Sequence, residues 1–181
     1  MQIYLFLAEG FEEIEAIAPI DIFRRAGLNV ITVSISSSKT VTGAHGISVL
    51  ADSIFEETKF ENDGFLFLPG GLPGTTNLDN HAGLKRLISQ YEQNSNKIAA
   101  ICAAPSVLGK MGLLAQKEAI CYPGFENQLQ EATLSMSDAV RSGNIFTAKA
   151  AGSALEFALM IVGDLKGKEV SETIRKAMFI K

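Results

Sequence analysis

Short, continuously apolar runs recur along the chain, and stretches with helical spacing of apolar residues separate them. The clearest runs are 3–7, 65–68 and 98–101, the last of them directly after Lys97, and the clearest helical stretches are 12–26 and 82–94. A strand that is buried on both faces is apolar throughout, whereas a half-buried strand alternates between apolar and polar residues. The pattern therefore predicts a mostly parallel sheet with helices on both faces. With right-handed crossovers, this is a flavodoxin-like three-layer α/β/α sandwich.

Shorter elements complete the pattern. Residues 41–50 contain Gly43 and Gly46 and predict a β-hairpin that leaves the main sheet. No internal repeat, low-complexity tract or linker divides the chain, and 181 residues are enough to bury a sizeable core. We therefore expect one domain over 1–181. Further strands are expected at 28–33, 119–121, 139–141 and 145–148, and further helices at 153–165 and 168–177.

The composition argues against several classes of protein. The formal net charge is −4 and Lys and Arg form no cluster, so we expect no nucleic-acid partner. No apolar run approaches the ~18 residues that a membrane span requires, so no membrane partner is expected. Residues 1–7 are apolar but lack a preceding basic region, which favours a strand over a signal peptide. Two cysteines do not make a disulfide framework, which fits a reducing, cytoplasmic compartment.

One cysteine lies where a strand is predicted to turn sharply into a helix. Residues 97–101 predict a buried strand, and a helix is expected to begin near Pro105, which the first helical turn tolerates. Small residues flank Cys102 and relieve the crowding of such a turn. This pattern is typical of a nucleophile elbow, and a helix N-terminus beside the thiol is expected to lower its pKa. The alternative is simple packing, since free cysteine is often buried, and we interpret Cys121 in that way.

A glutamate stands within an apolar part of the first predicted helix. Apolar residues surround Glu15 on nearly every side, so its carboxyl is expected to be half-buried with a raised pKa. A protonated carboxyl can donate a hydrogen bond to a thiolate. The alternative is a side chain that extends to the surface. Gly10, Gly70 and Cys102 each follow a predicted strand, so their loops are expected to meet on one rim of the parallel sheet.

A glycine-rich loop follows the strand at 65–68. Its sequence, Pro-Gly-Gly-Leu-Pro-Gly, matches neither the P-loop nor the dinucleotide fingerprint, so no nucleotide cofactor is expected. Such glycines are usually turn residues, but they also let backbone N–H groups approach a ligand. The N–H groups of Gly71 and Ala103 are candidates for an oxyanion hole. His45 and His81 do not adjoin Cys102, and no His, Cys and Asp cluster has metal-ligand spacing, so no metal is expected.

A resemblance to a known family rests on six segments, 8–15, 21–27, 68–71, 100–105, 152–158 and 167–170. The chain resembles the ThiJ/PfpI superfamily, in the branch of the Parkinson-disease-associated protein deglycase and bacterial YajL. The resemblance implies that Cys102 is a reactive cysteine that oxidises readily to sulfinate, with Glu15 as its protonated partner and Gly71 and Ala103 as N–H donors. It also implies a cofactor-free glyoxalase that converts methylglyoxal to lactate, protein deglycation, chaperone and oxidative-stress roles, and a homodimer.

Three positions depart from that family. Peptidase-type relatives have a histidine directly after the nucleophile, where this chain has Ala103, so a protease is disfavoured. Tyr122 stands where the deglycase has a histidine, and His45 stands where relatives have an arginine near the pocket, so both are possible pocket residues. Without that histidine, Glu15 alone is left to act as general acid and base.

The resemblance, together with these residues, implies two classes of function. The first is a cysteine-dependent enzyme that acts on small reactive carbonyls or glycated proteins, in which Cys102 adds to an aldehyde and Glu15 moves the proton. The second is a redox-responsive stress protein or chaperone in which Cys102 is oxidised. A thiazole monophosphate enzyme of thiamine biosynthesis is a weaker third hypothesis, because no known phosphate loop is present. Both leading hypotheses need an accessible thiol, so the sequence does not separate them.

Overall fold

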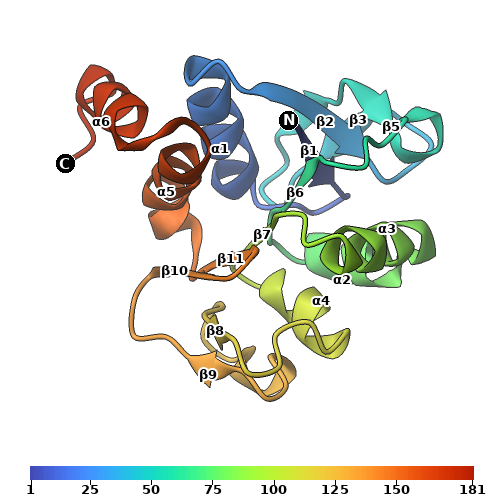
Figure 1. Cartoon of the computed structure of the whole chain (residues 1–181). Helices are drawn as coiled ribbons and strands as arrows, with labels where there is room; N and C mark the ends of the chain where they lie inside the picture. Colours follow the sequence, from blue (N-terminus) through green and yellow to red (C-terminus); the bar gives the residue numbers. More distant parts are fainter.

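The computed structural model describes residues 1–181, and its centre is a seven-stranded sheet (Figure 1). In the order β10-β11-β7-β6-β1-β2-β5, every neighbouring pair is parallel except β10 and β11. This mostly parallel sheet confirms the fold class that the continuous apolar runs predicted. The strands are β1 (Gln2–Leu7), β2 (Asn29–Ser34), β5 (Ser53–Ile54), β6 (Phe65–Leu68), β7 (Ile98–Ile101), β10 (Ala139–Ser142) and β11 (Ile145–Ala148).

Helices cover both faces of the sheet (Figure 1). The four helices predicted at 12–26, 82–94, 153–165 and 168–177 are α1, α3, α5 and α6, and their ends agree within one residue. One face carries α1 (Glu13–Arg25), α5 (Ala154–Lys166) and α6 (Lys168–Ala177). The other face carries α2 (Gly74–Asn80), α3 (Ala82–Gln93) and α4 (Pro105–Lys110).

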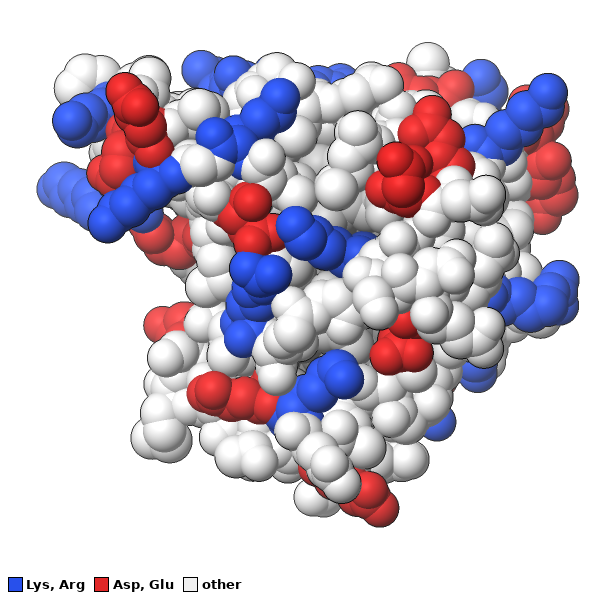
Figure 2. Space-filling view, viewed as in Figure 1, with Lys and Arg blue, Asp and Glu red and all other residues white.

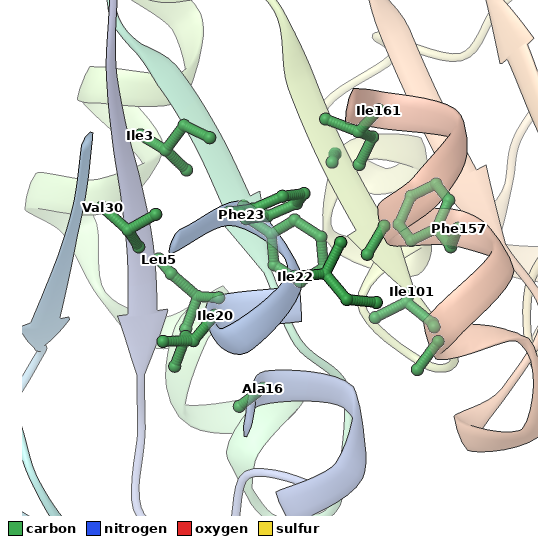
Figure 3. Packing of buried hydrophobic residues seen from close by; sticks show 14 of the residues in the cluster. Ile3, Leu5, Ala16, Ile20, Ile22, Phe23, Val30, Ile101, Phe157 and Ile161 are labelled. Atoms are coloured by element: carbon green, nitrogen blue, oxygen red, sulfur yellow. The ribbon is translucent and has the colours of Figure 1, made fainter. Parts of the chain in front are cut away.

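The sheet is apolar on both faces because a layer of helices covers each of them. Along β1, Ile3 and Leu5 pack in the cluster with α1 and α5, whereas Tyr4 and Phe6 pack in the cluster with α3 and α4. Figure 3 shows the first cluster, to which Phe157 of α5 contributes an aromatic ring. Full burial of one such side chain stabilises the fold by about 1.5–3 kcal/mol. The two clusters therefore hold the three layers together.

Two small sheets lie outside the central one. β3 (Thr40–Thr42) and β4 (Ser48–Leu50) form the hairpin that was predicted at 41–50. The strand predicted at 119–121 is β8 (Glu118–Ala119), which pairs with β9 (Thr133–Leu134) and not with the central sheet. The sequence analysis missed β5, β9 and α2. Two-residue strands and a short helix rich in Gly, Thr and Asn carry too little periodicity and helix propensity to be detected.

Charged side chains are mixed over the surface. Figure 2 shows Lys and Arg interspersed with Asp and Glu on one face of the molecule. Several of them form ion pairs between elements, among them Arg24 with Asp52 and Lys110 with Asp79. No helix combines the length and the apolar character that crossing a bilayer requires.

Candidate active site

Cys102 lies directly between β7 and α4, on the turn that the sequence predicted. Its φ is +64°, in the left-handed region that a residue with a side chain seldom adopts. Its N–H donates to the carbonyl of Ala148 at 2.9 Å, and its carbonyl accepts from the N–H of Tyr122 at 2.7 Å. Strained backbone of this kind is typical of functional sites, where the surrounding structure imposes it. The elbow therefore has the expected geometry, with Cys102 9% exposed.

Gly70 brings the loop after β6 against both Cys102 and α1. Its N–H donates to Oε2 of Glu15 at 2.9 Å. A β-carbon at this position would stand 2.6 Å from the β-carbon of Cys102 and 2.6 Å from Oε2 of Glu15, so only glycine fits without a shift. Just after this loop, the N–H of Gly74 donates to the carbonyl of Gly10 at 3.1 Å. The loops after β1, β6 and β7 therefore meet on one rim, as predicted.

Glu15 is buried beneath this rim, in the first turn of α1. It is 1% exposed and accepts the N–H of Gly70, and the thiol of Cys102 and the N–H of Ala151 are near enough to lower its pKa. The alternative of a side chain that extends to the surface is therefore wrong. The reason lies in the helix, because the apolar face of α1 packs on the sheet and α5 and carries Glu15 inward with it.

Burial raises the pKa of Glu15 to about 7, and the negative charge of Glu12 adds to this increase. This is the direction that the sequence predicted. Burial also raises the pKa of Cys102, to about 12, and ionised Glu15 is the second cause. The expectation that the helix N-terminus lowers the pKa of Cys102 is therefore wrong. The N–H groups of Gly71 and Ala103 do lower it, but burial and Glu15 raise it by more.

Cys102 and Glu15 titrate as a pair. An ionised carboxylate repels a thiolate, whereas a protonated carboxyl donates a hydrogen bond to it. The thiolate of Cys102 is therefore favoured when Glu15 holds the proton, and the thiol is favoured when Glu15 is ionised. A nucleophile and an acid–base group are thus coupled in one buried site.

Two backbone N–H groups face the sulfur of Cys102. Those of Gly71 and Ala103 lower the pKa of Cys102, as donors directed at its sulfur do. Gly71 has a φ of +90°, and a β-carbon there would collide with the backbone of Glu12, so this position requires glycine. The two donors that were predicted as an oxyanion hole therefore converge on the sulfur, where they stabilise negative charge.

The other candidate residues have different surroundings. The side chain of Tyr122 is half-exposed and forms no hydrogen bond within the protein. Only its backbone N–H contacts the elbow, by donating a hydrogen bond to the carbonyl of Cys102. The ring of His45 bonds to Glu13, with Nδ1 2.7 Å from Oε2, and not to the cysteine–glutamate pair. Cys121 is buried in the cluster with α4, and burial raises its pKa to about 11.

Two residues near the site escaped the sequence analysis. The carboxylate of Glu13 is buried under the hairpin, where Oε1 accepts the N–H of His45 at 2.7 Å. A β-carbon on Gly43 would collide with this carboxylate, so the hairpin glycine was the available signal for it. Ala151 reaches Glu15 only through its backbone N–H, and no side-chain pattern reveals such a contact.

The flavodoxin-like sandwich, the cysteine elbow and the buried glutamate together define a class of α/β protein with a cysteine–glutamate site. Comparison with known proteins identifies the family within that class. The DJ-1/PfpI family model matches residues 1–164. A protein of Caenorhabditis elegans named glutathione-independent glyoxalase DJR-1.2 is 31% identical, over 94% of this chain and 91% of its own length. Protein DJ-1 homolog B of Arabidopsis thaliana is 34% identical over 90% of this chain, but the chain spans only 38% of that longer relative.

A solved structure agrees with these relatives. Oxidized DJ-1 from Toxoplasma gondii matches with a TM-score of 0.91 and 32% identity, over 98% of this chain and 97% of that one. The chain therefore belongs to the DJ-1/PfpI family. This confirms the resemblance that the sequence motifs indicated, together with the flavodoxin-like fold.

Proposed function

We propose that this protein is a cysteine-dependent, cofactor-free enzyme that acts on small reactive carbonyl compounds such as methylglyoxal. The pairing of Cys102 with buried Glu15 carries the proposal, because one site then holds a nucleophile and a carboxyl whose pKa is about 7. A general acid or base works best when its pKa lies near the working pH. The name of the C. elegans relative, a glutathione-independent glyoxalase, supports the same class of reaction.

The reaction begins at the sulfur. The thiolate of Cys102 adds to the aldehyde carbon of methylglyoxal, and protonated Glu15 gives its proton to the new alkoxide, which yields a hemithioacetal. As the charge moves from sulfur to oxygen, the N–H groups of Gly71 and Ala103 stabilise it there. The carboxylate of Glu15 then removes the proton from the former aldehyde carbon, which gives an enediol as the hydroxyl proton passes to the neighbouring oxygen. Glu15 returns its own proton to the neighbouring carbon, and the C–O bond at the sulfur-bearing carbon becomes a carbonyl. This leaves a thioester of lactate, which water hydrolyses to lactate and free Cys102.

The small exposed fraction of Cys102 favours small carbonyls over glycated proteins as substrates. Cys102 is 9% exposed, and Glu15 beneath it is fully covered. A three-carbon aldehyde can reach such a sulfur. For an adduct on a glycated protein to reach it, the backbone of that protein must fit against the rim of the site. Protein deglycation is therefore the second activity to test and not the first.

Lactate formation tests the proposal directly. The protein, supplied with methylglyoxal but without glutathione or metal, should release several molecules of lactate per chain. Treatment with hydrogen peroxide should stop this turnover, because a cysteine sulfinate cannot add to a carbonyl. The proposal is wrong if the untreated protein forms no lactate. If peroxide then adds two oxygen atoms to Cys102, as read by mass spectrometry, the redox-responsive alternative is favoured.

We also infer a homodimer, with the apolar surface beside α1 as its interface. Ile14, Ile17 and Ile47 are exposed, and together with Leu155 and Met178 they line a hollow of about 510 Å³. Contiguous apolar side chains on a soluble protein commonly mark an interaction site. A second copy of the chain would cover these side chains through the same surface.

Light scattering after size exclusion measures the assembly. We expect about twice the chain mass of 19.4 kDa for the unchanged protein. Ile17→Glu should give a monomer, because a charge at the centre of an apolar interface is costly to desolvate. Met136→Glu is the matched control, since Met136 is exposed but lies outside this surface, and it should leave the dimer intact. A monomeric mass for the unchanged protein would contradict the inference.

A further inference from the structure

Three potential metal ligands meet where the β3–β4 hairpin covers the first turn of α1. A carboxylate oxygen of Glu12, a carboxylate oxygen of Glu13 and a ring nitrogen of His45 all lie within 4.8 Å of one another. We propose that these side chains form a site for a divalent transition-metal cation such as Zn²⁺. The spacing rules that predicted no metal did not detect it, because His45 lies 32 residues from Glu13 and only the hairpin brings it back.

Glu13 is held in place before a cation arrives. Its side chain is 8% exposed, Oε1 accepts the backbone N–H of His45 at 2.7 Å, and Oε2 lies 2.7 Å from Nδ1 of the same residue. The N–H of Ile47 also approaches Oε1, at 3.5 Å. These bonds fix the orientation of the buried carboxylate at the edge of the cluster.

Glu12 supplies the second carboxylate. As the N-cap residue of α1, it accepts the N–H of Glu15 on Oε2 at 2.7 Å, and its own N–H donates to the carbonyl of Gly70 at 3.0 Å. These bonds orient the side chain and leave its other oxygen free of hydrogen bonds within the protein. The ring of His45 is 70% exposed, so a cation can enter from solvent and water can complete its coordination.

The donor set selects the class of cation. One imidazole nitrogen with two carboxylate oxygens suits Zn²⁺ and its neighbours in the first transition row, whereas Mg²⁺ and Ca²⁺ prefer oxygen ligands. Two carboxylates and a neutral imidazole balance the charge of the cation. The cation would replace the hydrogen bond between Nδ1 and Oε2. Ligands at about 2.0–2.1 Å from zinc lie further apart than hydrogen-bonded atoms, so the exposed ring must move outward slightly.

Calorimetric titration with Zn²⁺ at neutral pH, on chelator-treated protein, tests the site. We expect one Zn²⁺ per chain in the unchanged protein and in Cys102→Ser, where the reactive thiol no longer competes as a ligand. His45→Ala keeps its backbone bond to Glu13, yet it should bind Zn²⁺ about tenfold or more weakly. His81→Ala is the matched control and should bind as tightly as the unchanged protein.

Glu12→Gln provides a second variant, because the amide oxygen can still cap α1 but is a poorer ligand than a carboxylate. Its affinity for Zn²⁺ should also fall. The proposal is overturned if the unchanged protein binds no Zn²⁺, or if His45→Ala or Glu12→Gln binds as tightly as the unchanged protein. Loss of binding in Cys102→Ser would likewise overturn it, since the ion would then belong to the thiol.

Discussion

Cys102→Ser should lower methylglyoxal turnover to the rate measured without protein, because a serine hydroxyl stays protonated at neutral pH and adds poorly to a carbonyl. The exchange replaces one sulfur by oxygen and keeps both backbone bonds of the elbow, to Ala148 and from Tyr122. The fold should therefore persist, and the loss can be assigned to the chemistry. Lactate assays beside thermal unfolding of the same samples provide the measurement.

Cys121→Ser is the matched control for this prediction. Cys121 is 1% exposed and packs in the cluster with α4, away from Glu15. The serine should keep most of the turnover, although a buried hydroxyl without a partner should lower the free energy of unfolding by about 1–3 kcal/mol. If Cys121→Ser lost turnover while Cys102→Ser kept it, our assignment of the nucleophile would be wrong.

The layers of the fold were predictable because burial on both faces marks the sequence directly. β6 reads Phe-Leu-Phe-Leu, and all four residues are completely buried. α2 shows the limit of this kind of inference. Its residues are poor helix formers, and the helix is stabilised by tertiary contacts, since Leu78 is buried in the core and Nδ2 of Asn77 donates to the carbonyl of Glu9 at 2.8 Å.

The candidate site was predictable where a residue broke its local pattern. Glu15 interrupts an apolar stretch, and Cys102 stands among small residues at the end of a strand. The pKa of Cys102 was not predictable from its own helix, because it depends on burial and on the charge of Glu15 from another element. His45 was placed near the pocket only because it stands where relatives have an arginine. A hairpin side chain can reach several neighbours, and here it reaches Glu13.

Glu15→Gln and Glu15→Leu should both lower turnover about 10²–10⁴-fold, since neither side chain can carry a proton between carbon atoms. They should differ in their effect on the thiol. Glutamine keeps an N–H donor toward the sulfur and leucine offers none, so the pKa of Cys102 should be lower in Glu15→Gln than in Glu15→Leu. The rate of iodoacetamide alkylation at a series of pH values measures this order. Glu57→Gln, at an exposed position, is the control and should change neither quantity.

The pH dependence of the free energy of unfolding tests the role of Glu15 independently of turnover and alkylation, again with Glu15→Gln. Burial raises the pKa of Glu15 from 4.5 to about 7, so the folded protein prefers the protonated carboxyl. The stability that this preference contributes is complete below about pH 4.5 and is lost as the pH rises through 7, about 3 kcal/mol in all. Glutamine does not titrate. Between about pH 4 and pH 8, urea unfolding should therefore show Glu15→Gln gaining a similar free energy relative to the unchanged protein. Parallel curves for the two proteins would mean that Glu15 is not the buried acid of this site.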